Sequence, residues 1–451
     1  MEMPRSPIIR CGMVTRDDQL NQRLVPFDVP PGTTSIYVKY SYTGREGGNA
    51  IDLGLLGIDK EFRGYSGGSK FEVTVANDQA SPGYIPGPLG VGEWYVLLGV
   101  YNITSPASYQ VEITLDDSPR PCFKANPAPA RASSSQIKRP PGQRPTYRWL
   151  KGDFHTHTLY SDGKFTLDEL VSKALNRGLD FIFSTEHNTF SANLVWGSHV
   201  PPGFLVGRGI EVTTFAGHWN AIGLMPHQFI DPRIYDMRDK DASLVAAVEE
   251  VHKSDGFAIL NHPFAECKCC EWTFSFHDHI DAIEVWNGPW KRHPKDESNI
   301  KAVEKWDKLL REGKIFTASA GSDIHEPRFE IAEPLTRVLS DDESVSAIIR
   351  GLRARHVYIT QHPSYEIEFY LCHNGETAGI GDWLKTTEDV IASVTIKGFP
   401  ECEVRLITEN GIAEKTSRAS LSVKMKANYI RVEVRNAQDD MLGLTNPIWI
   451  L

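Results

Sequence analysis

The sequence predicts an α/β protein in which a β/α barrel or doubly wound sheet is flanked by an N-terminal β-sandwich and a C-terminal β domain. Three observations support this fold class. Residues 1–117 alternate polar and apolar side chains, residues 147–360 alternate strand-like and helix-like segments, and residues 361–451 return to simple alternation. A period of two is typical of strands with one buried face, whereas strand–helix repeats indicate parallel strands joined by crossover helices.

The N-terminal segment, residues 1–117, is predicted to be a small antiparallel β-sandwich. Gly- and Pro-containing turns separate its alternating runs, and short alternating runs divided by turns are typical of sandwiches. The clearest predicted strands cover residues 35–40, 71–75, 94–98 and 109–115. Catalytic residue types do not cluster in this segment, so we expect a structural role.

Residues 118–146 are predicted to be an extended linker between domains. This stretch is rich in Pro, Ser, Ala and Arg and has little apolar patterning. Such a composition suits a linker rather than a packed element. A domain boundary is therefore expected before residue 147.

The central segment, residues 147–360, is predicted to alternate strands and helices. Thr166 and Glu169 form a capping-box pattern before an apolar periodic run, and Gly178 provides the helix end. Further strands are predicted at residues 181–183, 257–260, 282–285 and 316–317, with helices around residues 244–251 and 303–310. Alternating runs such as residues 365–370 and 429–434 then predict the C-terminal β domain, residues 361–451.

The bulk composition argues against several classes of protein. The 451-residue chain has a formal net charge of −10, so we expect no extended nucleic-acid interface, which needs many Lys and Arg residues. No apolar stretch is long enough to span a bilayer, and the first residues lack the apolar core of a secretion signal. Seven cysteines, an odd number, argue against a disulfide framework. We therefore expect a cytoplasmic protein without membrane contact.

One cysteine-rich stretch is weighed as a structural zinc site. Cys267, Cys269 and Cys270 are followed by His277 and His279, and Cys and His are the usual ligands of structural zinc. Only one Cys-x-x-Cys pair is present, however, and no second pair follows it. The sequence therefore favours a stretch without structural zinc.

Histidines and carboxylates follow the predicted strands of the central domain. His155 and His157 come after residues 150–154, His187 after 181–185, His262 after 257–261, and Asp323 and His325 after 316–321. The carboxyl ends of barrel strands meet at one rim, where active sites are built. A single histidine at a strand end is usually structural, but such a series predicts one polar site.

The spacing within these groups suits metal binding. In an extended segment, two residues separated by one place their side chains on the same side, so His155 and His157 can face one ion, as can Asp323 and His325. Glu211 offers a carboxylate able to bridge two ions. Mixed imidazole and carboxylate ligands favour zinc, manganese or iron.

The same residues resemble the motifs of the PHP (polymerase and histidinol phosphatase) metallohydrolases. The matching segments are His155-Thr156-His157-Thr158, Ser161-Asp162-Gly163, Thr185-Glu186-His187-Asn188, Asn261-His262-Pro263 and Gly321-Ser322-Asp323-Ile324-His325. Glu211-Val212-Thr213-Thr214, Gly217-His218-Trp219-Asn220 and the closing Thr445-Asn446-Pro447-Ile448 look like the CehA/McbA-like branch. The resemblance covers about residues 149–358 and leaves the N-terminal sandwich unexplained.

The resemblance implies a distorted (β/α)7 barrel that holds two or three divalent ions, Mn, Zn or Fe. Carried over position by position, the ligands of the first ion are His155, His157, Glu211 and Asp323, and those of the second include His187 and His325. Glu211 then bridges toward a further ion held by His218 and His262. Asp162 also counts as a metal ligand, although several members of the family have a histidine here.

The function implied is phosphoester hydrolysis, of a small phosphodiester or phosphomonoester, by a metal-activated hydroxide. Asp323 is the candidate for orienting the attacking water and accepting its proton. His187 or His325, if left partly free of metal, is the candidate for protonating the leaving group. The alternative is a carbamate or carboxylic ester hydrolase on the same site, and a second alternative is a metal-containing binding protein without catalysis. In either hydrolase the partner is a small-molecule substrate.

Several further residues are candidates for substrate contacts. Asn188 and Asn287 follow the rim motifs, although Asn also orders turns and loops. Lys291 and Arg292 are either anion contacts or a solvated surface pair. An aryl substrate needs an apolar slot, and the candidates to line it are Trp196, Trp219, Trp286 and Trp290.

Overall fold

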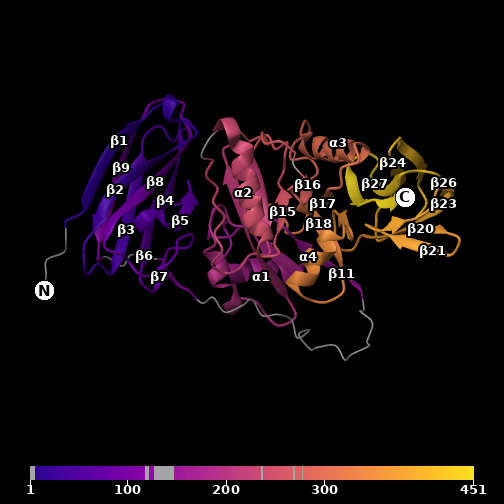
Figure 1. Ribbon diagram of the computed structural model, residues 1–451, viewed down its shortest axis with the longest axis horizontal. Helices are drawn as coiled ribbons and strands as arrows, with labels where there is room; N and C mark the ends of the chain where they lie inside the picture. Colours follow the sequence, from indigo (N-terminus) through magenta and orange to yellow (C-terminus); the bar gives the residue numbers. More distant parts are fainter. Residues whose placement is uncertain (1–5, 117–120, 126–146, 235–236, 268–269, 277) are drawn as a thin grey trace.

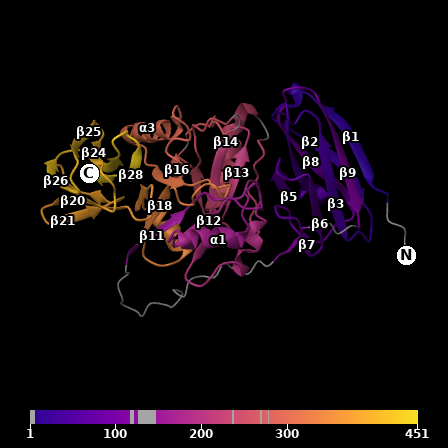
Figure 2. The same cartoon turned by 180° about the vertical axis from the view of Figure 1, so that it is seen from behind.

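A computed structural model describes residues 6–116, 121–125, 147–234, 237–267, 270–276 and 278–451. Three regions lie in a row: N-terminal β-strands at one end, a central region of strands and helices, and C-terminal strands at the other end (Figure 1). The view from behind shows the same order (Figure 2). No helix among these residues is both long and apolar enough to cross a membrane.

The N-terminal region consists of two antiparallel sheets that share one apolar core. The larger sheet contains, in order, β1 (Ile8–Val14), β9 (Ala107–Leu115), β3 (Ser35–Tyr42), β6 (Glu72–Ala76), β7 (Gln79–Ala80) and β10 (Phe123–Lys124). The smaller contains β2 (Asn21–Val29), β8 (Gly92–Asn102), β4 (Ala50–Leu56) and β5 (Phe62–Gly67). Alternate residues such as Val38, Val96 and Ile113 are buried between the sheets, as expected when one face of each strand is apolar.

The predicted linker is wrong at two residues. Phe123 and Lys124 form β10, which pairs with β7 of the larger sheet, and the Phe123 ring packs against Tyr160 of the central region. We attribute this short strand to the packing of the Phe123 ring, which favours an ordered position although the surrounding residues are rich in Pro. Residues 117–120 and 126–146 of the predicted linker lie outside the described residues.

The central region is built on a mixed sheet. Its strands, in order, are β17 (Thr317–Gly321), β16 (Ala282–Asn287), β15 (Phe257–Leu260), β14 (Gly217–Ile222), β13 (Leu205–Thr214), β12 (Phe181–Ser184), β11 (Arg148–Asp153), β18 (Leu335–Ser340) and β19 (Val357–Thr360). Its helices are α1 (Leu167–Asn176), α2 (Lys240–His252), α3 (Ser298–Arg311) and α4 (Val345–Arg353). The predicted strands at 181–183, 257–260 and 282–285 are confirmed.

The predicted closed β/α barrel is not confirmed. The pairs β11–β12, β12–β13, β15–β16 and β16–β17 are parallel, but β13–β14, β14–β15 and β11–β18 are antiparallel. Within the described residues the strands form no closed hydrogen-bonded ring, since β17 ends the order. The physical reason at β14 is local: only Phe215 and Ala216 separate β13 from β14, so a hairpin replaces a helical crossover.

The capping box that begins α1 is confirmed. Thr166 N donates to Glu169 Oε2 at 2.8 Å, and Thr166 Oγ1 accepts from Glu169 N at 3.3 Å. The helix buries Leu170, Val171 and Ala174 on one face, and Gly178 follows with a φ of 73°. These contacts set the strand-to-helix connection that leads from β11 past the first histidines.

The C-terminal strands continue the central sheet, whereas the sequence predicts a flanking C-terminal β domain. Beyond β19 the order continues with β28 (Met441–Thr445), β27 (Tyr429–Arg435), β24 (Glu403–Thr408) and β25 (Gly411–Thr416), with β29 (Ile448–Ile450) pairing β27 and β22 (Trp383–Leu384). A second sheet contains β21 (Glu376–Gly379), β20 (Glu366–His373), β23 (Val390–Lys397) and β26 (Ser420–Met425). Buried Arg431 also pairs with Asp307 of α3 at 2.9 Å.

The N-terminal sheets contact the central region beside its first histidine loop. Lys70 Nζ donates to Ser161 O at 2.8 Å, and Gly83 N donates to Ser191 Oγ at 2.9 Å. Gly83 has a φ of 97°, and a Cβ there would lie 2.8 Å from Tyr160 O, so only glycine fits this approach. Burial lowers the pKa of Lys70 to about 8.

Candidate metal centre

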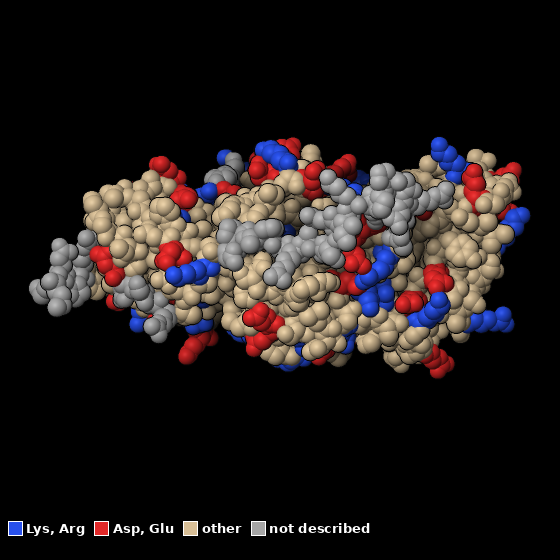
Figure 3. All heavy atoms as spheres, turned by 90° about the horizontal axis from the view of Figure 1, so that it is seen from below, with Lys and Arg blue, Asp and Glu red and all other residues tan. Residues whose placement is uncertain are grey.

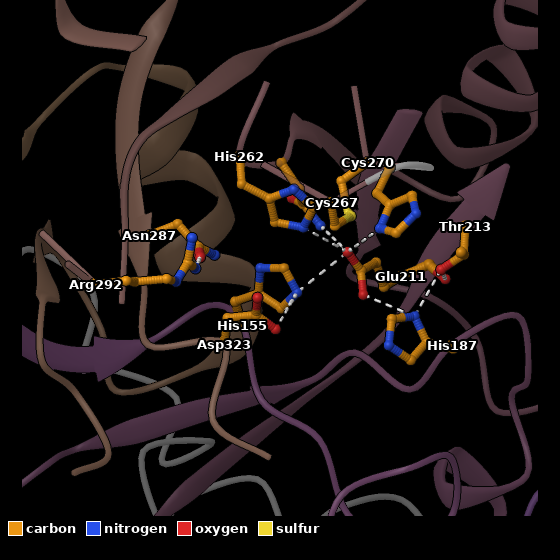
Figure 4. The surroundings of a disulfide bond; sticks show 12 residues. His155, His187, Glu211, Thr213, His262, Cys267, Cys270, Asn287, Arg292 and Asp323 are labelled. Atoms are coloured by element: carbon orange, nitrogen blue, oxygen red, sulfur yellow. Dashed lines mark hydrogen bonds and ion pairs between the residues drawn. A yellow bond between two sulfur atoms is a disulfide. The ribbon is translucent and has the colours of Figure 1, made fainter. Parts of the chain in front are cut away.

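The predicted strand-end residues meet at one place in the central region. His155 and His157 follow β11, His187 follows β12, and His262 follows β15, while Asp323 and His325 follow β17. Glu211 and His218 lie on the β13–β14 hairpin and face each other across it. Figure 4 shows His155, His187, His262 and Asp323 arranged around Glu211.

Glu211 is the centre of this arrangement. Its side chain is fully buried, and each carboxylate oxygen contacts several imidazoles. Around Oε1 lie His262 Nε2 at 3.2 Å, His155 Nε2 at 3.3 Å and His218 Nδ1 at 3.3 Å, and around Oε2 lie His187 Nδ1 at 2.9 Å and His157 Nε2 at 3.4 Å. One carboxylate is therefore placed to be shared between neighbouring ions.

Four overlapping groups of side chains have donor atoms within 4.8 Å of one another. They are His157 with Asp162, His187 and His325; His155 with His157 and Glu211; His155 with His262 and Asp323; and His218 with His262 and Cys270. All nine predicted metal ligands are thus brought together. Compared with the predicted grouping, His157 is shared with His187 and His325, and Cys270 is an addition.

The donor set fits divalent metal ions. Buried polar atoms in proteins are almost always hydrogen-bonded, because an unpaired one is costly. Several donor atoms here are buried and make no hydrogen bond to the described residues: His155 Nε2, His157 Nε2, His218 Nε2, His262 Nδ1, Asp162 Oδ1, Glu211 Oε2 and Asp323 Oδ1. Metal coordination would satisfy such imidazole and carboxylate atoms.

Glu284 orients the first histidine. Its Oε1 lies 3.0 Å from His155 Nδ1, and its Oε2 accepts from His262 N at 2.9 Å and Asn287 Nδ2 at 3.0 Å. When Nδ1–H donates to this carboxylate, Nε2 keeps its lone pair toward Glu211 and Asp323. Sequence reasoning missed this role, although a glutamate within the apolar strand β16 was a usable signal.

The electrostatics of the centre split its histidines into two kinds. Burial, reinforced by neighbouring His325 and His187, lowers the pKa of His157 to about 3. Burial also opposes charge on His187 and His325, but nearby carboxylates outweigh it and raise their pKa values to about 9 and about 10. Burial raises the pKa of Glu211 and of Asp323, but the neighbouring histidines, above all His155, outweigh it and hold both pKa values well below the usual range.

The backbone is strained at three loops of the centre. Asn188, His262 and Asp323 have φ angles of 53°, 25° and 52°, in a region that non-glycine residues seldom adopt. Each follows a strand end that supplies a donor. Such conformations cost about 1–3 kcal/mol each and persist where the surroundings impose them, often at functional sites.

The two predicted substrate contacts have intramolecular partners. Asn188 Oδ1 accepts from Thr213 N at 2.8 Å, and its Nδ2 donates to Thr213 O at 2.9 Å. These bonds hold Thr213, whose Oγ1 lies 2.6 Å from His187 Nδ1. Asn287 is almost fully buried and bonds Glu284 and Arg292. The geometry therefore favours orienting roles for both asparagines.

A cleft of about 360 Å³ opens onto the centre, and a positively charged side chain, Arg292, forms part of its wall. His262 and Asp323 line it together with Arg292, His293 and the two cysteines Cys267 and Cys270. Among the described residues, the Arg292 guanidinium makes no ion pair, whereas Lys291 pairs with Asp440 at 2.5 Å. A larger hollow of about 660 Å³ lies between the N-terminal sheets and the central region, but no proposed metal ligand lines it.

Cys267 and Cys270 form a disulfide beside the centre (Figure 4). The expectation from an odd cysteine count was wrong for this pair, because proximity in the folded chain and not the total number decides pairing. For the weighed zinc site, Cys269 and His277 lie outside the described residues, and Cys270 groups with His218 and His262 instead. The position of Cys270, eight residues after His262, was the signal that sequence reasoning missed.

Comparison with known proteins gives partial structural likenesses. No family model and no curated protein matches the chain. A two-domain protein from Bacteroides vulgatus, described as containing a predicted PHP-like metal-dependent phosphoesterase, is 20% identical over 68% of this chain and 98% of its own, with a TM-score of 0.37.

Two further structures are similar to smaller parts of the chain. A protein from Bifidobacterium adolescentis, provisionally described as a metal-dependent phosphoesterase, is 17% identical over 47% of this chain and 98% of its own, with a TM-score of 0.28. An amidohydrolase from Chromobacterium violaceum with bound sulfate is 17% identical over 39% of this chain and 88% of its own, with a TM-score of 0.26. Because these superpositions are partial, any functional conclusion has to rest on the centre itself.

Proposed function

We propose that this protein is a metal-dependent hydrolase that cleaves a small phosphodiester or phosphomonoester. One observation carries the choice of substrate: the Arg292 guanidinium, which hydrogen-bonds Asn287 and makes no ion pair with a described residue, shares a cleft with His262 and Asp323. A guanidinium matches the planar arrangement of phosphate oxygens and stays charged at all working pH values. A phosphoester bound there has its anionic oxygens beside the proposed metal ligands.

The proposed ligands hold two or three divalent ions, Mn, Zn or Fe. His155, His157, Glu211 and Asp323 would hold one ion, His187, His325 and Asp162 a second, and His218 and His262, which both contact Glu211, a third. When bound, such ions lower the pKa of a water and stabilise negative charge on the entering and leaving oxygens. The buried carboxylates offset the positive charge of the ions.

The chain's own residues divide the remaining work. Asp323 is 18% exposed and lines the cleft, so its carboxylate is placed to accept a proton from an attacking water. His325 is the most exposed histidine of the centre, at 29%, and lies beside Asp162. When it is not coordinated to an ion, His325 is the better placed of the two candidate acids to protonate a leaving group, with His187 behind it at 20%.

An aryl carbamate or carboxylic ester fits the cleft less well. Such a substrate needs an apolar slot, but the four tryptophans considered for it are buried in the hydrophobic core. None of them lines the cleft: Trp196, Trp219, Trp286 and Trp290. The resemblance to the CehA/McbA-like branch nevertheless suggests hydrolysis of these esters. The experiment must therefore distinguish ester hydrolysis from phosphoester hydrolysis.

The surface charge agrees with a small substrate. The chain is acidic overall, with 58 Asp and Glu residues against 48 Lys and Arg. On the face shown in Figure 3, basic side chains occur in small groups beside acidic ones. A polymeric nucleic acid requires a continuous basic track, and this face presents none among its described residues.

The decisive experiment measures p-nitrophenol release from bis(p-nitrophenyl) phosphate and from p-nitrophenyl acetate by manganese-loaded protein. Phosphodiester turnover should depend on Asp323, so Asp323→Asn should abolish it. Arg292→Ala should raise the KM for the phosphodiester and leave that for the acetate unchanged. Turnover of the acetate alone would favour the ester hydrolase, and bound metal without any turnover would favour a binding protein.

A further inference from the structure

Cys270 lies against the part of the centre that has the fewest carboxylates. One imidazole nitrogen of His218, one of His262 and the Cys270 sulfur are within 4.8 Å of one another. Both histidines are more than nine-tenths buried, and His218 Nε2 and His262 Nδ1 make no hydrogen bond within the described chain. Figure 4 shows Cys270 and His262 on the same side of Glu211.

We propose that the Cys270 thiolate is a ligand of the ion held by His218 and His262, and that the Cys267–Cys270 disulfide controls this position. A thiolate is a strong ligand for zinc and similar ions and commonly shares them with imidazoles. A disulfide sulfur has no such charge, so bonding to Cys267 removes Cys270 from the ligand set. Only the reduced chain then offers two imidazoles, one thiolate and the Glu211 carboxylate together.

The exposure of the two cysteines determines which sulfur an external thiol attacks. Cys267 is exposed, whereas Cys270 is half-buried. The thiolate of a small-molecule thiol therefore attacks the Cys267 sulfur, the disulfide bond breaks, and its electron pair leaves with the Cys270 sulfur. A second thiol resolves the mixed disulfide at Cys267. Two external thiols are oxidised to a disulfide, and the protein gains two thiol groups, of which Cys270 loses its proton on binding the ion.

The location links this switch to the cleft. Cys267 and Cys270 line the same cleft as His262, Asp323 and Arg292. Reduction therefore changes both the ligand set of one ion and the wall that faces the proposed substrate. The inference requires a metal centre but not phosphoester hydrolysis, so it can fail or hold independently of the proposed substrate.

Cobalt(II) substitution tests the proposal, because a thiolate bound to cobalt(II) produces a charge-transfer band in the near ultraviolet. The full chain carries Cys269→Ser throughout, so that this neighbouring thiol cannot replace Cys270. It is compared after oxidation and after reduction with a phosphine, followed by anaerobic desalting. We expect the band, and one more tightly bound ion per chain, only in the reduced protein.

Two variants make the outcome specific. Cys267→Ser should show the band without any reductant, because Cys270 then has no disulfide partner. Cys270→Ser should lose the band in both states while its remaining ions, measured by elemental analysis, are retained. Cys372→Ser, which changes a half-buried cysteine on β20, is the matched control and should behave like the parent. Equal spectra and ion contents in the oxidised and reduced parent would overturn the proposal, as would a band that survives in Cys270→Ser.

Discussion

Replacing Glu284 by glutamine should weaken metal binding although no proposed ligand is changed. Glu284 accepts hydrogen bonds on both oxygens, at 3.0 Å from His155 Nδ1 and at 2.9 Å from His262 N. Glutamine has one oxygen and one NH₂ group, so its donor must face one of these donors. If the glutamine NH₂ group faces His155, the hydrogen bond to His155 Nδ1 is lost, or the ring proton moves to Nε2, the nitrogen that faces Glu211.

The size of the effect follows from the hydrogen bond that is lost. A buried donor left without its partner costs about 1–3 kcal/mol, and each 1.4 kcal/mol corresponds to about tenfold in a dissociation constant. We therefore expect the Kd of the ion at His155 to rise on the order of 10- to 100-fold, the range typical of residues that orient metal ligands.

Competition with a chromophoric chelator at fixed pH measures this Kd. Urea unfolding of the chelator-treated variant shows whether it is still folded. Glu249→Gln, on the exposed face of α2, makes the same chemical change away from the centre and should leave the Kd unaltered. A folded Glu284→Gln protein with the Kd of the wild type would refute the orienting role.

Three other perturbations test the electrostatic reasoning. His187 and His325 have pKa values of about 9 and about 10, so both must lose a proton to bind an ion. Calorimetry at pH 7.5 in buffers of different ionisation enthalpy should therefore show that about two protons are released. The affinity for the ions should also rise with pH. Buffer-independent heats would contradict this. Arg431→Leu removes one of the two arginine partners of Asp307 and of Glu433, leaving Arg311 and Arg435, and should cost about 3 kcal/mol in urea unfolding, the lower end of the range for a broken buried pair. Burial raises the pKa of Glu433, but Arg431 and Arg435 outweigh it and hold the pKa at about 2. Wild-type stability from this group, present above pH 4.5, should therefore fall as the pH drops toward 2, and the variant, which keeps only Arg435, should lose less. Chelation of the ions should lower the thermal midpoint, and manganese should restore it; an unchanged midpoint would mean that the folded chain binds the ions weakly.

The types of residue in the centre could be predicted from sequence because the rules involved are local. A period of two places His155 and His157 on one side of the chain, and strand-end positions bring His187, His262 and Asp323 to a common rim. The capping box at Thr166 is equally local and was confirmed. Each of these conclusions needs only neighbours along the chain and the general behaviour of strands and helices.

The sheet was less predictable because strand pairing is not a local property. The β13–β14 hairpin and the pairing of β19 with β28 depend on which edges meet in space. A buried strand has the same apolar composition in a parallel or an antiparallel pair, so composition alone suggested the wrong, all-parallel arrangement. Burial of Phe123 likewise drew part of a Pro-rich stretch into a sheet.

By itself, then, the sequence determined a set of imidazole and carboxylate donors at strand ends in a mainly acidic chain. Only the tertiary structure decided that Glu211 contacts five of the histidines, that Glu284 orients His155, that Arg292 lacks an ion-pair partner among the described residues, and that Cys270 lies beside His218. These relations join residues far apart in the chain, and their distances exist only after folding.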